Sequence, residues 1–140
     1  MQAQPPDARP PLPWFALVLT LLGCCGLSAA WVAIALVTGS QCTWMALLAA
    51  LDAAWLLRLG GASPGVARML AGVLATIAAI ALAHWGIVAA HLSGMVGMGL
   101  LDSALRLGPS LAWTLSTIAN HPVDLVLLGA GVVLAAVVSR

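Results

Sequence analysis

The sequence predicts an all-α, polytopic membrane protein in which four transmembrane helices form a bundle. The chain is 63% hydrophobic and only 6% charged, whereas a soluble domain carries about 25% charged residues. Its apolar residues lie in runs close to the ~20 residues that cross a bilayer, and short Gly-, Ser- and Pro-containing segments separate these runs. Charged groups are too few to cover a water-facing surface, so the expected surroundings are lipid.

The N-terminal segment, residues 1–13, differs from the rest because it holds five prolines, Pro5, Pro6, Pro10, Pro11 and Pro13. This composition predicts a short disordered or polyproline tail on the cytoplasmic side. Residues 14–140 are expected to form a single membrane domain. Its first span, predicted over 14–38, begins at Trp14, a residue type that is enriched at membrane interfaces.

The second and third spans are predicted over 42–59 and 66–92, with a Gly- and Pro-containing break between them. Alanine recurs at every fourth position of the third span, and the second span carries a similar set. Small residues at this spacing allow two helices to approach closely, so these antiparallel helices are expected to pack through their alanine faces. The packing residues are Ala67, Ala71, Ala75, Ala79 and Ala83 on the third span and Ala46, Ala50 and Ala54 on the second.

Residues 101–120 mix apolar and hydroxyl side chains, and Gly108-Pro109 divides the segment in two. This pattern predicts a short interfacial or re-entrant helical hairpin before the last span. Pro109 suits the first turn of a helix. The last span is predicted over 122–139, with Asp124 in its first turn, where a carboxylate complements the helix dipole.

The arginines orient the predicted spans. With the N-terminus inside, Arg9, Arg58, Arg68 and Arg140 are all cytoplasmic and Arg106 lies outside, as the positive-inside rule favours. Both termini are therefore expected in the cytoplasm. Lys, Glu and Tyr are absent and Ala, Leu and Gly dominate. That bias is typical of a GC-rich bacterial genome, so the expected location is the bacterial cytoplasmic (inner) membrane.

One carboxylate, Asp52, falls within the second span, where an ionised side chain costs roughly 2.5–3.5 kcal/mol on insertion scales. Asp52 is about 9 Å from the inner boundary, and Thr20 and Thr76 are expected at a similar depth. The three residues define a predicted intramembrane polar cluster. Three interpretations stay open: a proton or cation site, a neutral carboxyl group that bonds helices together, and a pairing with a cationic residue of a partner protein.

A second polar group is predicted near the outer side, formed by His84, His91, His121 and Cys42. His84 and His91 are seven residues apart and so share a helix face. Histidine can bind haem iron or other metals, but the chain has no metal-ligand motif such as Cys-x-x-Cys-His. We therefore predict no metal and no cofactor.

These observations leave several functions open. The first hypothesis is a small accessory or assembly subunit that acts through helix–helix contacts with a membrane-protein partner or with a second copy of itself. An alternative is a small homo-oligomeric transporter or channel that couples ions or protons to Asp52, and a third is a haem- or metal-binding subunit that uses His84 and His91. No nucleophile–base pair or nucleotide motif occurs, so catalysis by this chain is not expected. The net charge of +1 gives no basic patch for nucleic acid.

Overall fold

The computed structural model describes residues 13–97, 99, 102, 105, 108–119 and 122–140 of the chain, and this part is helical without a strand. The principal helices are α1 (Trp14–Thr38), α2 (Met45–Leu59), α3 (Val66–Val96), α5 (Pro109–Ala119) and α6 (Pro122–Val138). The all-α prediction is confirmed, and two of the helices are long and apolar enough to cross a membrane.

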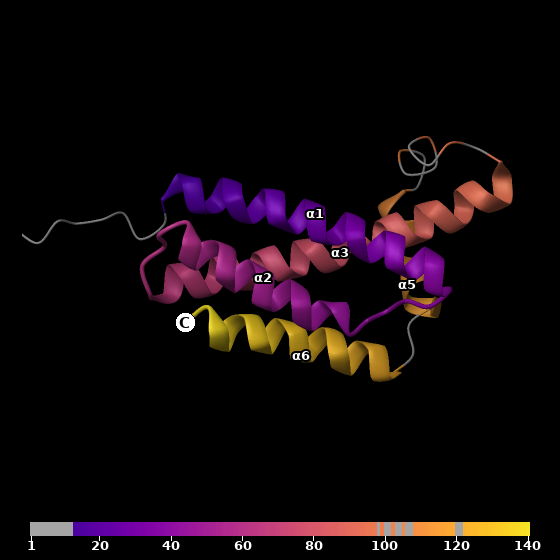
Figure 1. Cartoon of the computed structure of the whole chain (residues 1–140). Helices are drawn as coiled ribbons and strands as arrows, with labels where there is room; N and C mark the ends of the chain where they lie inside the picture. The colour runs from indigo at the N-terminus through magenta and orange to yellow at the C-terminus, as the bar shows by residue number, and fades with distance from the viewer. Residues whose placement is uncertain (1–12, 98, 100–101, 103–104, 106–107, 120–121) are drawn as a thin grey trace, which may run out of the picture.

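Four of the helices run side by side, and successive ones point in opposite directions (Figure 1). The central pair, α2 and α3, pack on each other, and each also packs on α1 and on α6. The outer pair, α1 and α6, lie on opposite sides of this centre (Figure 1). The start of α1 and the end of α6 are therefore at the same end of the molecule.

Glycine and proline set the helix boundaries. Gly39 after α1 and Gly97 after α3 have φ of 64° and 68°, a left-handed conformation that glycine adopts without steric cost and that commonly ends a helix. Pro109 and Pro122 are the first residues of α5 and α6, positions where the missing N–H breaks no helical hydrogen bond. Local sequence therefore accounts for these four helix ends.

The helices differ in length, and this bears on which of them cross a membrane. The two that meet the length and composition of a span are Trp14–Thr38 and Val66–Met95. By contrast, α2 has 15 residues and α6 has 17, or about 22 and 26 Å at the helical rise, against a hydrocarbon core of about 30 Å. The structure therefore supports a membrane protein with two candidate spans, and the four-span bundle stays a prediction.

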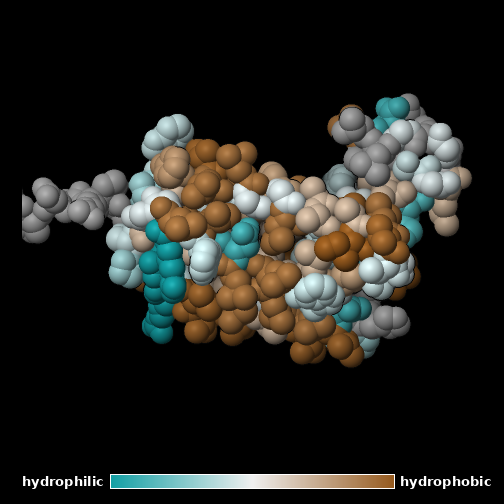
Figure 2. Space-filling view, in the orientation of Figure 1, coloured by the Kyte–Doolittle hydropathy of each residue, from teal (hydrophilic) through white to brown (hydrophobic). Residues whose placement is uncertain are grey.

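The surface agrees with lipid surroundings. Figure 2 shows a face that is mostly hydrophobic along the packed helices, with hydrophilic colours concentrated toward the ends and one small hydrophilic patch in the middle. Large apolar side chains such as Leu21, Leu22 and Leu74 are exposed. In water so many exposed apolar residues would promote aggregation, whereas in a bilayer they are the expected contact surface.

The segment after α3 is only partly described. The helix α5 packs on α3 and begins at Pro109, the residue expected to start a helix. Most of the first half of the predicted 101–120 hairpin lies outside the described residues, as do Arg9, Arg106 and the tail before residue 13.

Candidate functional site

The carboxylate of Asp52 lies at the middle of α2, as the eighth of its 15 residues. The side chain is half-buried. Within the described part of the chain, no hydrogen bond or ion pair reaches it. Asp52 is therefore a carboxyl group in the middle of an apolar helix, and the described residues give it no hydrogen-bond or ion-pair partner.

The space for Asp52 comes from a glycine on α1. A Cβ atom built on Gly23 would lie 3.2 Å from Oδ2 of Asp52 and 2.0 Å from the Cδ1 atom of Leu56. A larger residue at position 23 would therefore displace Leu56 and crowd Asp52. The missing side chain brings α1 and α2 together beside the carboxylate.

The face of α2 around Asp52 is apolar and exposed. Leu48 and Leu51 precede the carboxylate, and Trp55 and Leu59 follow it, at intervals of three or four residues that place all of them near one helix face. All four are exposed, with Trp55 at 65%. We call Leu48, Leu51, Asp52, Trp55 and Leu59 the α2 stripe. It is an apolar strip with one carboxylate at its centre, a pattern suited to contact another helix.

The two threonines predicted to join Asp52 bond elsewhere. The hydroxyl of Thr20 donates to the carbonyl oxygen of Ala16 at 2.7 Å. The hydroxyl of Thr76 donates to the carbonyl oxygen of Gly72 at 2.8 Å. Both threonines are buried, and each satisfies its hydroxyl on the preceding turn of its own helix. The structure therefore gives Asp52 no hydrogen bond from either threonine.

Two side chains that the sequence analysis did not select join α1 to α3. The thiol of Cys24 donates to the carbonyl oxygen of Ala75 at 3.4 Å, and the hydroxyl of Ser28 lies 2.6 Å from the carbonyl oxygen of Cys24 and 3.1 Å from that of Ala79. The signal was present in the sequence, because small residues recur every fourth position of α1. They are Ala16, Thr20, Cys24 and Ser28, and all are buried.

The alanine stripes lie at more than one helix contact. On α3, Ala75 and Ala79 face Cys24 and Ser28 of α1 through the bonds above, and Ala79 also packs with Ala49 of α2. On α2, the backbone of Ala46 lies against Gly131 of α6. Ala50, Ala54, Ala79 and Ala83 are buried, while Ala67, Ala71 and Ala75 are partly buried. The stripes therefore serve contacts of α2 and α3 with the outer helices as well as with each other.

His84 and His91 lie on one face of α3 and orient their rings in the same way. Nδ1 of His84 bonds to the carbonyl oxygen of Ile80 at 2.9 Å, and Nδ1 of His91 bonds to that of Ile87 at 2.8 Å. Since a carbonyl oxygen only accepts, each Nδ1 carries a proton, and in the neutral form of the ring Nε2 is then the acceptor. Nε2 of buried His84 has no partner among the described residues.

The surroundings of the two histidines differ. The ring of His84 meets that of Trp31 edge-on, with centroids 5.8 Å apart, and the indole of Trp31 donates to the backbone of Gln41 at 2.8 Å. His91 is exposed. Histidines that bind a metal through Nε2 commonly have Nδ1 bonded to a carbonyl oxygen, as in these two rings. The described residues, however, contain no group of three or more His, Cys, Asp or Glu that could hold a metal ion. His121 lies outside those residues.

Cys42 lies in the loop between α1 and α2 and adopts a φ of 46°, unusual for a residue other than glycine. Its Sγ lies 3.3 Å from the hydroxyl oxygens of Ser40 and of Thr38. These two hydroxyls, Ser40 foremost, lower the pKa of the Cys42 thiol below its ordinary value. Cys42 is therefore a loop thiol with enhanced thiolate character.

Comparison with protein families, with curated proteins and with solved structures gives no match to this chain. Its function therefore has to be argued from the chain's own geometry.

Proposed function

We propose that this chain is a small integral membrane subunit that acts through helix–helix contacts, and that its partner binds the α2 stripe by pairing with Asp52. The observation that carries the proposal is the carboxylate at the middle of α2 with no partner inside the described chain. A lone carboxylate at that depth is costly, and an ammonium, guanidinium or hydrogen-bond donor on a partner helix would offset the cost.

The surroundings of Asp52 support a contact surface more than a conducting path. The buried hydroxyls of Thr20, Ser28 and Thr76 all bond to backbone carbonyl oxygens. Within the described residues they therefore offer no chain of free polar groups from Asp52 to either end of the helices. The flanking side chains of the α2 stripe are large, apolar and exposed, as on the lipid-facing surface elsewhere, so Asp52 is the group that would give a partner helix a specific contact here.

We place the four packed helices across a bacterial inner membrane, with both termini in the cytoplasm. Arg58 donates to the carbonyl oxygen of Val138, and Arg68 donates to that of Ser139, so these arginines gather at the end that holds the last residues of α6. The positive-inside rule assigns this end to the cytoplasm. In this arrangement α2 and α6 cross where the bilayer thins around them.

The experiment is photo-crosslinking in the native membrane from two matched positions. A benzophenone amino acid replaces Trp55 of the α2 stripe in one variant and exposed Leu74 of α3 in the other. We expect one discrete adduct with a second protein from position 55 and a weaker or absent one from position 74. The adduct should disappear when Asp52→Asn is added. Crosslinking to lipid alone from position 55 would refute a partner at the α2 stripe.

A second function, a homo-oligomeric proton- or ion-coupled transporter, draws on the same unpaired carboxylate, because a carrier needs a mid-membrane group that can gain and lose a proton. Two outcomes identify it: an adduct of position 55 with a second copy of the chain, and proton flux into liposomes that Asp52→Asn abolishes. A heterologous adduct without flux would instead identify the accessory subunit.

A further inference from the structure

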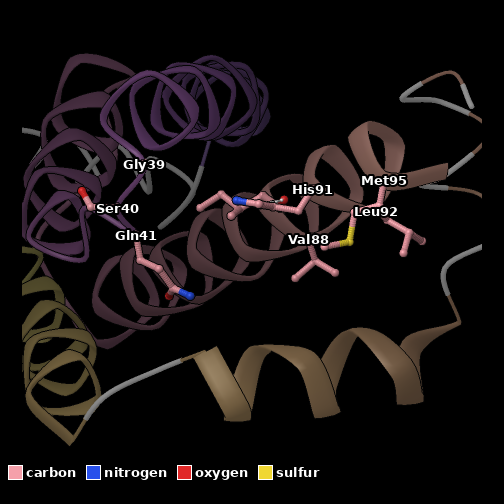
Figure 3. A pocket seen from close by; sticks show the side chains of 8 residues that line it. Gly39, Ser40, Gln41, Val88, His91, Leu92 and Met95 are labelled. Carbon is pink, nitrogen blue, oxygen red and sulfur yellow. Dashed lines mark hydrogen bonds between the residues drawn. The ribbon is translucent and has the colours of Figure 1, made fainter. Parts of the chain in front are cut away.

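A pocket of about 410 Å³ lies where the loop after α1 meets the second half of α3 (Figure 3). Its size falls within the roughly 300–1,000 Å³ of small-molecule sites. The loop forms a polar edge, and α3 forms a wall that is apolar apart from His91. The lining residues are Gly39, Ser40, Gln41, Ile87, Val88, His91, Leu92 and Met95. A polar edge beside an apolar wall suits an amphiphile.

Two hydrogen-bond acceptors of the residues at the polar edge have no donor among the described residues. The first is Nε2 of His91, because Nδ1 already donates to the carbonyl oxygen of Ile87. The second is Oε1 of Gln41, which is buried and has no hydrogen-bond partner there. Figure 3 shows the ring of His91 reaching from α3 toward the loop that carries Gln41. A buried acceptor without a donor is destabilising, so a ligand that donates hydrogen bonds fits this edge.

In the proposed membrane placement, on which this inference rests, the pocket lies at the level of the lipid head groups. His91 lies 25 residues after Val66, the first residue of α3, or about 37 Å along the helix, beyond a hydrocarbon core of about 30 Å. Gly39 is at a similar height, directly after the 25 residues of α1. This end is opposite to Arg58 and Arg68. The described residues that line the pocket include no arginine, lysine or acidic residue, so they do not hold a phosphate by charge.

We propose that this pocket binds a phospholipid through a primary ammonium head group, as in phosphatidylethanolamine. The ammonium donates one N–H to Nε2 of His91 and, after the Gln41 amide turns from its buried position toward the pocket, a second N–H to Oε1 of Gln41. An acyl chain lies along the apolar wall of α3, and the phosphate stays in water. This binding is independent of the partner contact at Asp52, which lies in the middle of α2.

The test compares two lipids that differ in hydrogen-bond donors. The full chain is analysed in detergent by native mass spectrometry with phosphatidylethanolamine or with phosphatidylcholine of the same acyl chains; choline carries the same charge but no N–H. We expect about tenfold greater retention of phosphatidylethanolamine, the effect of one charge-assisted hydrogen bond. Gln41→Leu and His91→Phe should each remove the preference. Thr114→Val, an exposed change on α5 outside the pocket, should keep it.

Further variants keep the test decisive. Gln41→Glu places a carboxylate beside the ammonium and should raise the retention of phosphatidylethanolamine, so a poorly folded Gln41→Leu protein does not remove the evidence. Equal retention of the two lipids by the unmodified chain would overturn the proposal, as would a preference that survives both Gln41→Leu and His91→Phe. Displacement of the lipid by an equal concentration of free ethanolamine would overturn the lipid as the source of the ammonium group.

Discussion

The guanidinium of Arg68, in the first turn of α3, donates a 2.9 Å hydrogen bond from Nε to the carbonyl oxygen of Ser139, just after α6. The same buried group also donates to the carbonyl oxygen of Ala62 at 3.4 Å and to the backbone oxygen of Arg140. Carbonyl groups at the end of a helix lack intrahelical partners, and a cation there complements the helix dipole. Arg68 therefore ties α3, the α2–α3 loop and the end of α6 together.

Arg68→Met should lower the free energy of unfolding by about 2–3 kcal/mol, because the carbonyl oxygens lose charge-assisted hydrogen bonds in a buried position. Thermal unfolding in detergent measures the change. Arg58→Met is the matched control: Arg58 is exposed and makes one bond, 2.8 Å to the carbonyl oxygen of Val138, so its loss should stay below about 1 kcal/mol. Equal losses in the two variants would show that burial of Arg68 contributes nothing.

Two glycines on α6, two residues apart, should respond oppositely to alanine. A Cβ on Gly131 would lie 2.9 Å from the backbone oxygen of Ala46, whereas a Cβ on Gly129 meets nothing within 4 Å. Gly131→Ala should push α6 away from α2 and cost about 1–3 kcal/mol. Gly129→Ala should be neutral or stabilise the helix by up to about 1 kcal/mol. Thermal unfolding of both variants measures the two changes in stability. A neutral Gly131→Ala variant would contradict the close approach of α6 to α2 at Gly131.

Local sequence was sufficient to predict the helices and the contact between α2 and α3, but not the contacts that these two helices make with α1 and α6. Gly39 and Pro109 mark helix boundaries whatever surrounds them, because their backbone restrictions are local. The period-four alanines indicated a helix contact, yet the carbonyls of Ala75 and Ala79 receive their hydrogen bonds from α1. Any small-residue face can accept any other such face, so the partner is chosen by the whole set of contacts.

The candidate site, too, could be predicted from the sequence only in part. The sequence placed Asp52 inside an apolar helix, but depth alone suggested Thr20 and Thr76 as its partners. Depth gives no information on rotation about the helix axis, and a hydroxyl can always bond to the carbonyl four residues earlier, as both threonines do. Arg68 served in the sequence only as a marker of orientation, because its bonds to Ser139 and Arg140 join residues 71 and 72 positions apart.

Cys42 should be the most reactive thiol of the chain. The thiolate is the nucleophile, and the hydroxyls of Ser40 and Thr38 lower the pKa of Cys42. Its alkylation rate should therefore reach half-maximum at a lower pH than that of an ordinary thiol, and Ser40→Ala should move the profile to higher pH. Cys24, which is buried, should react slowly. Mass spectrometry after timed maleimide treatment measures each rate.

The same reaction tests the proposed orientation. Cys42 lies in the α1–α2 loop, at the end opposite to Arg58 and Arg68, so a membrane-impermeant maleimide added outside intact cells should label it. Introduced cysteine at Ser63, in the α2–α3 loop, should react after the membrane is opened. The reverse pattern would place both termini outside and contradict the positive-inside assignment.

Replacing Asp52 by leucine should separate stability from partner binding. In the purified chain, Asp52→Leu removes a carboxylate that has no partner among the described residues, so the free energy of unfolding should rise by about 1–3 kcal/mol. In the native membrane the same variant should lose the partner, because the apolar α2 stripe then has no group to pair with a cation.

Asp124→Leu is the contrasting variant. Asp124 accepts a 2.7 Å hydrogen bond from Thr43 and so joins α6 to the start of α2, and its replacement should destabilise the purified chain. Loss of stability in purified Asp52→Leu would mean that the carboxylate holds its own helices together, and the search for an outside partner would then move away from the α2 stripe.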